Sequence, residues 1–536
     1  MQVPFQLGLI TAAAAGAILS ACGGGGGGGG GGDGGPPPLT VEKVASCATG
    51  AKPETALQGQ VPAALRSSGF GGFDCNLSLV GQLKGEGGNW SSATFTDGSG
   101  KTCAYYSTAS PVAANGTPIA GRQFPGVPVI DMTDPTKPVR VTSLTTPAML
   151  EPWESLRVND RRQILIADNG QNGGGTAEID IYDISGNCAS PQLLASMPVG
   201  TGQDGGIQPA TPPRGHEGNI SPDGLTYYIG DLRNAAYHAV DITNTTRPKL
   251  IATYSISALG LAGVTTHGLA VSNDGNRAYA VILGGLAGLP GGPNTAAPNN
   301  GFVIFDTSEI QQRKPNAQMK VISTVVFPDG SIAQHTIPAR INGKEYMIMV
   351  DEGGAGGLQD PAAAGVKRAC DANMAPFPMA RIYDLADEKK PELVSKLMLE
   401  THDPKNCDKV IPDILGLSTF TYGSHYCALD NRDNATALAC SYFNSGIRVF
   451  DIRNPLRPTE IAYYNPPAGS AALPGSSHAN RGQWKPGSPD WCASRLDFDF
   501  AKKRVTTMCQ DNGLLILQFA PNTWPFPQST PSRNQS

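Results

Sequence analysis

Four of the seven histidines in this chain occupy the same position in a recurring sequence unit, which makes them the first candidates for chemistry. The unit is a short apolar strand, a tight turn and a second strand, and each copy begins at His216, His267, His335 or His425. Imidazole and carboxylate groups that converge on a concave opening are the ingredients of a metal site or of an acid–base pair. The sequence therefore raises a His and carboxylate site as a hypothesis.

The register of these units predicts that the candidate side chains share one rim. In an antiparallel hairpin, residues equidistant from the turn face each other. The turn 222–225 places His216 opposite Asp231, and the turn 341–344 places His335 level with Asp351. The same rim is predicted to carry Trp90, Trp153, Glu154, Asp168, Glu217, His267, Glu352, His425 and Asp511.

Three interpretations of this rim stay open. The histidines could be structural latches that hydrogen-bond the neighbouring unit, with an opposed Asp fixing the tautomer of each ring. They could bind a ligand or a divalent metal, or they could act in catalysis. The sequence assigns no catalytic residue. His238, His402 and His478 fall outside the register, and we expect surface or loop positions for them.

A second repeated feature predicts the elements that position these residues. An apolar strand that ends in Asp is followed by a turn, a proline and another apolar run. The strand-ending residues are Asp131, Asp183, Asp241, Asp306, Asp384 and Asp451, and Gln518 holds the seventh position. We expect the six carboxylates at the opposite rim, where each accepts an amide hydrogen of the following turn.

Together the two features give four strands per period and seven periods. Asp-Gly and Asn-Gly turns in the hairpins tolerate positive φ, which favours tight β-turns. Four-stranded units repeated around a ring predict an all-β fold, a seven-bladed β-propeller. Residues 76–83 should pair beside residues 514–519 and close the ring, because both edges would otherwise be exposed.

The repeat resembles that of a known family. The segments PVIDMTDPTKPVRV, HAVDITNTTRPKLI and IRVFDIRNPLRPTEI are similar to the signature of the LVIVD-repeat β-propellers of bacterial cell-surface proteins. The resemblance covers residues 76–520. It implies a surface-exposed propeller and no particular reaction.

The N-terminus indicates export. Residues 1–21 read as a signal peptide that is too short to span a bilayer comfortably, and Leu19 to Cys22 resembles the lipobox of bacterial lipoproteins. Cys22 is the predicted lipidation site, and Gly23 after it favours the outer membrane, on its periplasmic or cell-surface side. A Gly/Pro-rich tether (22–40), an N-terminal extension (41–75), the propeller (76–520) and a C-terminal tail (521–536) follow.

The cysteine count fits an oxidising compartment. Without Cys22, ten of the eleven cysteines remain, an even number that predicts disulfides. Hairpin positions favour the pairs Cys427–Cys440 and Cys492–Cys509. Cys370 and Cys407 form a third candidate pair across long loops. The sequence does not assign partners to the remaining four, Cys47, Cys75, Cys103 and Cys188. No C-x-x-C motif supports a zinc site.

The composition narrows the possible classes of function. A net charge of −5 with no basic run argues against nucleic acid. We predict a lipid-anchored binding or scaffold module for a partner protein, glycan or polymer, attached to the outer membrane. The alternative is a metal-binding protein or metal-dependent enzyme that uses the His and carboxylate rim. No cofactor is certain, and a divalent metal is the one that the residues favour.

Overall fold

Apolar runs such as ILIAD and FVIFD form strands that are buried on both faces, and these strands build the centre of each blade. The computed structural model describes residues 40–108, 123–169, 177–284, 299–329, 331–357, 362–417, 420–474, 476–480 and 485–526. The predicted signal peptide, Cys22 and nearly all of the tether lie outside these ranges. All described residues belong to one unit, Pro37–Ser536.

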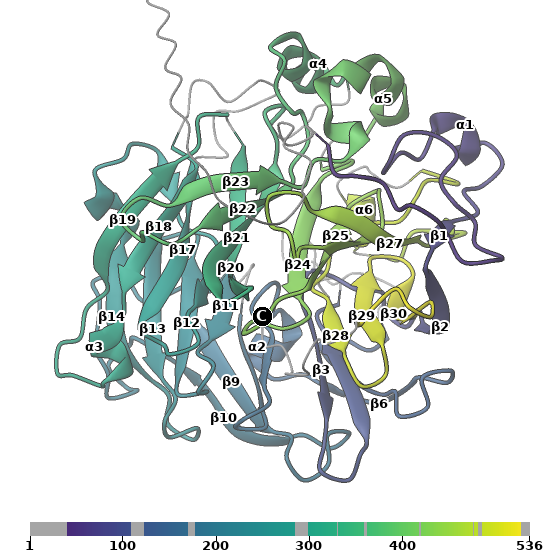
Figure 1. The fold of residues 1–536 in the computed structure, drawn as a ribbon. Helices are drawn as coiled ribbons and strands as arrows, with labels where there is room; N and C mark the ends of the chain where they lie inside the picture. The colour runs from purple at the N-terminus through teal and green to yellow at the C-terminus, as the bar shows by residue number, and fades with distance from the viewer. Residues whose placement is uncertain are drawn as a thin grey trace, which may run out of the picture. The chain divides into compact units, whose positions relative to one another are not determined.

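Seven antiparallel sheets form the predicted seven-bladed β-propeller (Figure 1). The first strands of blades 1 to 7 are β3 (Ser92–Thr96), β7 (Arg157–Asn159), β11 (Glu217–Ile220), β16 (Leu269–Val271), β20 (Ile332–Ile341), β24 (Ser424–Leu429) and β28 (Asp497–Asp499). The second strands are β4 (Thr102–Tyr106), β8 (Ile164–Asp168), β12 (Thr226–Asp231), β17 (Arg277–Gly284), β21 (Lys344–Gly353), β25 (Ala437–Tyr442) and β29 (Arg504–Cys509). The first strands contact one another in this order, and β28 contacts β3.

The third and fourth strands complete each blade. The third strands are β5 (Val127–Asp131), β9 (Glu178–Asp183), β13 (Ala236–Asp241), β18 (Gly301–Asp306), β22 (Ala380–Asp384), β26 (Ile447–Asp451) and β30 (Gly513–Phe519). The fourth strands are β6 (Val139–Leu144), β10 (Gln192–Pro198), β14 (Lys249–Ser255), β19 (Lys320–Val326), β23 (Glu392–Lys396), β27 (Thr459–Asn465) and β2 (Leu77–Leu83). Two further strands flank blades 4 and 6, namely β15 (Val264–Thr265) beside β17 and β1 (Phe73–Cys75) beside β27.

The ring closes as the sequence predicts. Leu77 pairs with Phe519 and Leu83 pairs with Leu514, so β2 near the N-terminus completes the last blade beside β30 (Figure 1). An apolar cluster also joins blade 7 to blade 1, with Met508 and Ile516 packed against Tyr106. Each of the other six blade interfaces has its own buried apolar cluster. The core therefore lies between blades, as expected where each blade buries its faces only against its neighbours.

The strand-ending carboxylates have the predicted structural role. Oδ1 of Asp131 accepts the backbone N–H of Thr133 at 3.0 Å, two residues along the chain. The same bond recurs at Asp183, Asp241, Asp306, Asp384 and Asp451. Gln518, at the seventh position, instead donates to the carbonyl oxygen of Lys503. These local turns fix the rim opposite the histidines.

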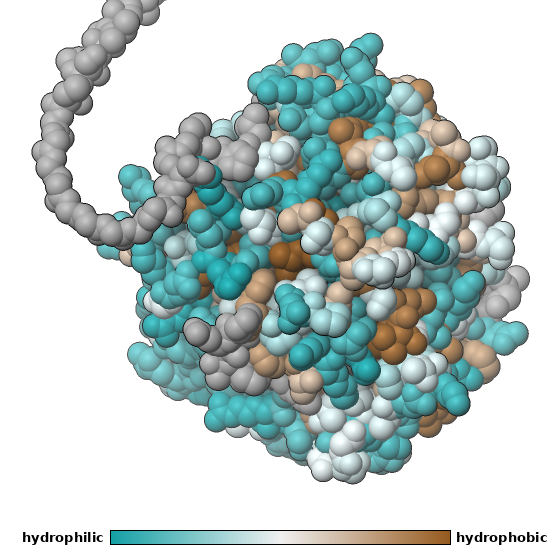
Figure 2. All heavy atoms as spheres, turned by 45° about the vertical axis from the view of Figure 1, so that its right-hand side comes forward, coloured by the Kyte–Doolittle hydropathy of each residue, from teal (hydrophilic) through white to brown (hydrophobic). Residues whose placement is uncertain are grey.

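A β-bulge at one position repeats in every blade. Pairing of the third and fourth strands skips one residue, which is Val141, Leu194, Ile251, Ile322, Val394, Ile461 or Val80 in blades 1 to 7. Bulges bend a strand and increase its twist. Large apolar side chains such as Val139, Leu193 and Val321 are exposed on these outer strands. On the face shown in Figure 2, apolar patches alternate with hydrophilic surface.

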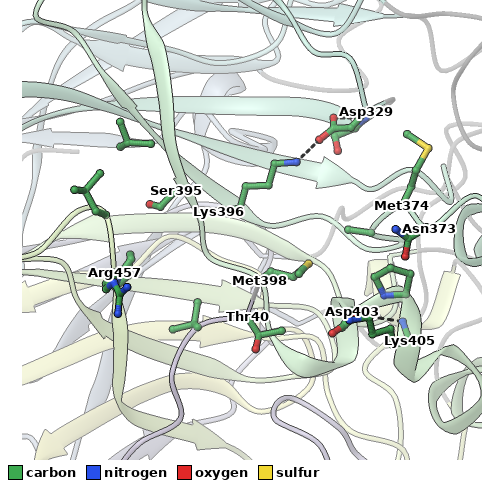
Figure 3. A pocket seen from close by; sticks show the side chains of 17 residues that line it. Thr40, Asp329, Asn373, Met374, Ser395, Lys396, Met398, Asp403, Lys405 and Arg457 are labelled. Atoms are coloured by element: carbon green, nitrogen blue, oxygen red, sulfur yellow. Dashed lines mark hydrogen bonds and ion pairs between the residues drawn. The ribbon is translucent and has the colours of Figure 1, made fainter. Parts of the chain in front are cut away.

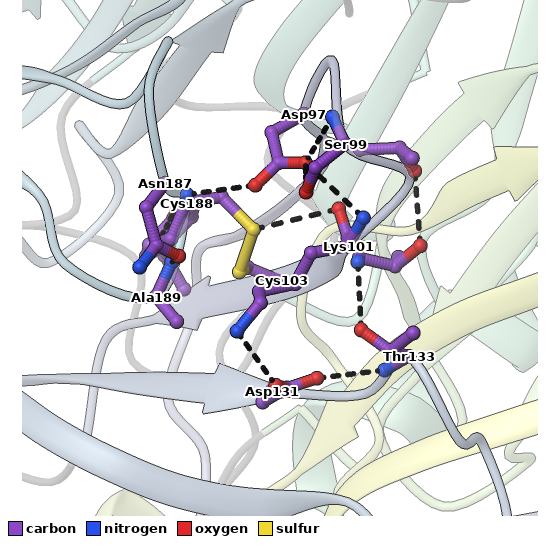
Figure 4. The surroundings of a disulfide bond; sticks show 12 residues. Asp97, Ser99, Lys101, Cys103, Asp131, Thr133, Asn187, Cys188 and Ala189 are labelled. Atoms are coloured by element: carbon purple, nitrogen blue, oxygen red, sulfur yellow. Dashed lines mark hydrogen bonds and ion pairs between the residues drawn. A yellow bond between two sulfur atoms is a disulfide. The ribbon is translucent and has the colours of Figure 1, made fainter.

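Five disulfides pair all ten cysteines of the described residues. The three predicted pairs Cys370–Cys407, Cys427–Cys440 and Cys492–Cys509 are confirmed. The unassigned cysteines form Cys47–Cys75 and Cys103–Cys188. Cys103–Cys188 joins blade 1 to blade 2 beside Asp97 and Asp131 (Figure 4). Several disulfides fit an exported protein.

The described part of the chain also contains short helices. The cysteines of one confirmed pair lie in α4 (Ala364–Asp371) and α5 (Cys407–Ile414) rather than in irregular loops as expected. The other helices are α1 (Ala63–Arg66), α2 (Pro147–Leu150), α3 (Ser308–Gln311), α6 (Ser477–Asn480), η1 (Ile256–Leu259), η2 (Glu400–His402) and η3 (Pro404–Asn406). Among the residues that the model describes, no helix has both the length and the apolar character needed to cross a bilayer.

Candidate metal group at the centre of the ring

Several of the predicted rim residues meet where the first strands begin, at the centre of the ring. Glu154 and Glu217 form a parallel β-bridge between blades 2 and 3. Glu154 also lies 3.7 Å from His425 of blade 6, which is not a neighbouring blade. The Glu154 side chain therefore reaches across the centre of the ring.

Three side chains from consecutive blades form a group with metal-binding geometry. Nε2 of His216 and Nε2 of His267 are 3.1 Å apart, and Oε2 of Glu154 lies 3.6 Å from His267 and 3.9 Å from His216. A circle through these three atoms has a radius of about 2.1 Å, which is the length of zinc–nitrogen and zinc–oxygen bonds in proteins. A divalent ion at its centre would contact all three atoms at bonding distance.

Glu217 orients one of these imidazoles. Its Oε2 lies 3.3 Å from Nδ1 of His267, so the Nε2 atom faces the group. Oε1 of Glu217 is held by Arg495 at 2.5 Å and by Arg157 at 3.4 Å. Burial would raise the pKa of Glu217, but Arg495 and His267 outweigh burial and lower the pKa to about 2. An ionised carboxylate behind a ligating imidazole is the usual support of a metal-bound histidine.

A glycine makes this support possible. A Cβ on Gly268 would lie 2.1 Å from Oε2 of Glu217, so only glycine leaves room for the carboxylate beside His267. Gly268 also donates its backbone N–H to the carbonyl oxygen of Gln334 in blade 5. The residue after His267 thus bonds blade 4 to blade 5 and leaves room for the carboxylate of blade 3.

Glu154 is held by uncharged donors. The Tyr426 hydroxyl donates to Oε2 of Glu154 at 2.9 Å, and Nε2 of Gln334 donates to the same oxygen at 3.4 Å. Burial raises the pKa of Glu154 to about 7, with Glu217 adding to the rise and His267 opposing it.

The pKa values of the two imidazoles of the group are shifted in opposite directions. Burial lowers the pKa of His267, but Glu154 and Glu217 outweigh burial and raise the pKa to about 9. Burial and the charge of His267 hold the pKa of His216 well below its usual value. A protonated His267 can donate from Nε2 to the unprotonated Nε2 of His216, and a metal ion bound by both nitrogens would replace this contact.

The other two predicted rim histidines have different partners. Nδ1 of His335 contacts Oε1 of Gln334, and its Nε2 accepts the backbone N–H of Cys427 in the next blade at 3.5 Å. His335 is therefore a latch between blades 5 and 6. Nδ1 of His425 donates to the carbonyl oxygen of Ala493 in blade 7 at 2.6 Å, while its Nε2 faces Glu154 and lies 4.0 Å from Glu352.

The predicted aspartates bind other protein groups. Asp168 accepts from the Tyr227 hydroxyl of blade 3 at 2.9 Å. Asp231 accepts the backbone N–H of Arg214 at 2.7 Å and lies 3.3 Å from Nε2 of His238. Asp351 accepts from Nε of Arg381 at 2.7 Å. Their described contacts are structural, and none of these aspartates belongs to the group formed by Glu154, His216 and His267.

Sequence reasoning missed several residues of the site. Four residues that belong to no recognised motif contact the carboxylates Glu154 or Glu217. They are Tyr426, Gln334, Arg157 and Arg495. Tyr426 and Gln334 are direct neighbours of rim histidines, which is the one signal that the sequence offers. The expected surface positions of His238, His402 and His478 are wrong, because all three side chains are buried. His238 lies in a strand, β13, whereas His402 and His478 lie in short helices of the connections between strands.

A second His and carboxylate group lies in blade 7. Nδ1 of His478 is 2.7 Å from Asp511 and 3.7 Å from Asp490. Burial raises the pKa of Asp490 to about 7, and Asp511 adds to the rise. Asp490 accepts the backbone N–H groups of Asp511 and Asn512, so this group braces a loop of the last blade.

A pocket of about 460 Å³ lies elsewhere, between blades 5 and 6 (Figure 3). Its lining includes β23 residues, Met374, Met398 and the segment 456–458. Lys396 reaches across it to Asp329 at 2.6 Å. None of the candidate metal ligands lines this pocket, and its Lys396 is already paired with Asp329.

Comparison with known proteins identifies no family. No protein-family model matches the chain. No curated protein matches it either. Membership of the LVIVD-repeat family therefore stays a prediction. The class that the fold and site define is a seven-bladed β-propeller with a candidate metal group at the centre of its ring.

Three solved structures illustrate the likeness. A candidate 6-phosphogluconolactonase of Bacteroides uniformis is 12% identical, with a TM-score of 0.48 over 79% of this chain and 93% of that chain. The periplasmic gluconolactonase of Pseudomonas aeruginosa is 11% identical (TM-score 0.41; 73% and 91% covered). Hydrazine synthase of Kuenenia stuttgartiensis is 12% identical (TM-score 0.44; 76% and 94% covered). At these identities the likeness concerns the fold alone, so no activity is taken from it.

Proposed function

We propose that this protein is an exported β-propeller that binds one divalent transition-metal ion through His216, His267 and Glu154. The observation that carries the proposal is the common distance of about 2.1 Å from one point to all three ligand atoms. Two imidazoles and one carboxylate suit zinc, copper, iron or nickel better than calcium or magnesium.

The surroundings support binding over a purely structural role. A latch would turn its ring nitrogens to uncharged groups and to the backbone of the next blade, as His335 does with Gln334 and Cys427. His267 instead turns Nδ1 to a carboxylate and Nε2 to a second imidazole and a second carboxylate. Three buried carboxylates, Glu154, Glu217 and Glu352, lie at this centre, and an ion would offset their mutual repulsion.

The cellular setting is part of the proposal. Five disulfides support export. Lipid attachment at Cys22, the outer membrane and a surface protein, glycan or polymer as partner stay predictions from the sequence. A β-propeller is consistent with a binding or scaffold module, and the metal group adds a specific ligand to that general role.

Metal analysis of the purified protein tests the proposal. We expect one Zn²⁺ per chain after chelation and reloading, and loss of that ion in the His216→Ala and His267→Ala variants. His335→Ala is the matched control, because it removes a rim histidine outside the group and should keep the metal. Absence of stoichiometric Zn²⁺, Cu²⁺, Fe²⁺ and Ni²⁺ from the folded wild-type protein would refute the proposal.

A further inference from the structure

The candidate metal group is more open on one side than on the others. The side chain of His216 is 13% exposed, whereas those of His267 and Glu154 are 4% exposed. Three ligands that surround an ion in one plane leave positions above and below that plane for an exchangeable ligand. Such a ligand would reach the ion beside His216.

An indole borders this side. The ring of Trp153 lies 6.4 Å from that of His216 at an interplanar angle of 50°, and 5.7 Å from the ring of Trp90, edge to face. Trp153 is only partly buried, and it directly precedes the candidate ligand Glu154. Among the described residues, an aromatic side chain therefore lies beside the more exposed ligand, His216.

The position of Trp153 is held against its backbone preference. Its φ is 48°, in the left-handed region that bulky residues avoid. The carbonyl oxygen of Trp153 accepts from the Ser91 hydroxyl at 2.7 Å, and Ser155 donates its backbone N–H to Pro152 at 2.7 Å. Residues held in such conformations cluster at sites that bind ligands.

The aromatic surface continues behind Trp153. Trp90 packs against the His425 ring at 4.8 Å and belongs to a cluster with Tyr426, Phe443 and Trp491. The indole N–H of Trp90 is buried and has no hydrogen-bond acceptor among the described residues. A buried donor without an acceptor is costly, so an acceptor for this N–H would be favourable.

We propose that the open position of the metal takes a planar aromatic molecule with a metal-binding oxygen, such as a phenolate or catecholate, whose ring packs on Trp153. The inference rests on the metal site proposed above. Indole and imidazole rings at this entrance favour a second ring through edge and face contacts. A sugar would instead need a polar partner for each buried hydroxyl.

Binding of two small chelators to the Zn²⁺-loaded protein tests this inference. Nitrocatechol is aromatic and changes its absorbance on coordination, whereas acetohydroxamate also binds metals through two oxygens but has no ring. We expect the wild-type protein to prefer nitrocatechol. Trp153→Gly, which suits the positive φ, should weaken nitrocatechol binding about tenfold and leave acetohydroxamate binding and zinc content unchanged.

The conservative variant and the metal content separate the possible outcomes. Trp153→Phe keeps a ring and should restore most of the nitrocatechol affinity. Equal weakening of both chelators, or no effect of Trp153→Gly, overturns the aromatic ligand while the zinc content still supports the metal site. Failure of the wild-type protein to bind zinc would instead overturn the proposed function itself.

Discussion

Glu217 lies 3.3 Å from Nδ1 of His267, and this contact sets which nitrogen of the imidazole faces the candidate metal position. The carboxylate is itself fixed by two arginines, Arg495 and Arg157, so the orientation of His267 depends on a buried charge network. The metal group is therefore supported by residues that do not touch the metal.

Replacing the supporting carboxylate should weaken metal binding without removing a ligand. We expect Glu217→Gln to lower zinc affinity 10- to 100-fold, because the amide is a poorer acceptor for His267. Competition with a chromophoric chelator measures the change. Glu217→Asp should recover part of the loss, and an unchanged affinity in Glu217→Gln would show that Glu217 does not position the ligand.

Adding one methyl group beside the same carboxylate should have a similar effect. The Cβ of Gly268→Ala would meet Oε2 of Glu217 at 2.1 Å, so either Glu217 or the strand must shift. We expect a lower zinc affinity in the same competition assay. Gly98→Ala is the control, because its Cβ would have nothing within 4 Å. Equal affinity of the two variants would contradict the predicted crowding.

His402 should make the protein sensitive to acid. Its ring is buried, where Nε2 donates to the Tyr422 carbonyl oxygen at 2.9 Å and Nδ1 accepts the backbone N–H of Leu399 at 3.3 Å. Burial lowers the pKa of His402 to about 4. The unfolded chain binds the proton first, so stability falls as the pH drops from about 6.5 to about 4, by about 3 kcal/mol in total.

The matched variant for this pH effect is His402→Gln, which can keep both hydrogen bonds but does not titrate. Thermal unfolding of both proteins between pH 7 and pH 4 measures the difference in slope. The wild-type Tm should fall more steeply. Parallel pH profiles would show that folding does not lower the pKa of His402.

The interblade disulfide should contribute more stability than a disulfide within a hairpin. Cys103–Cys188 spans 85 residues, and Cys427–Cys440 spans 13. In the chain-entropy model the longer loop gives about 4–5 kcal/mol and the shorter about 3 kcal/mol. Urea unfolding of the two double Cys→Ala variants compares them. A larger loss in the Cys427→Ala/Cys440→Ala variant would go against the loop-length argument.

The structural features that the sequence predicts are mainly those that depend on residues close together in the chain. The turn at Asp131 and its five counterparts follows from a carboxylate two residues before an amide, and Cys427–Cys440 follows from the register of one hairpin. The closing pair of residues 76–83 and 514–519 follows from the count of strands. Cys103–Cys188 could not be assigned, because its partners lie in different blades whose contact depends on tertiary structure.

For the site, too, the sequence predicts what depends on nearby residues and not what depends on tertiary packing. The register places His216, His267, His335 and His425 at one rim, but it does not give the side-chain torsions that separate a latch from a ligand. His335 turns to Gln334 and Cys427, whereas His216 and His267 turn to each other. Asp168, Asp231 and Asp351 share the predicted rim, yet their hydrogen-bond partners come from tertiary packing that the sequence does not reveal.

The closing strand has a consequence for the order in which the site is made. Glu154, His216 and His267 come from three consecutive blades, whereas β2 can pair only after β30, near the other end of the chain, is available. A protein that is exported from its N-terminus would bring the three metal ligands together before its ring is sealed. Assembly of the three ligands and closure of the ring therefore depend on different parts of the chain, and blade 6, which carries His425 and Tyr426, would join the ligands between these two events.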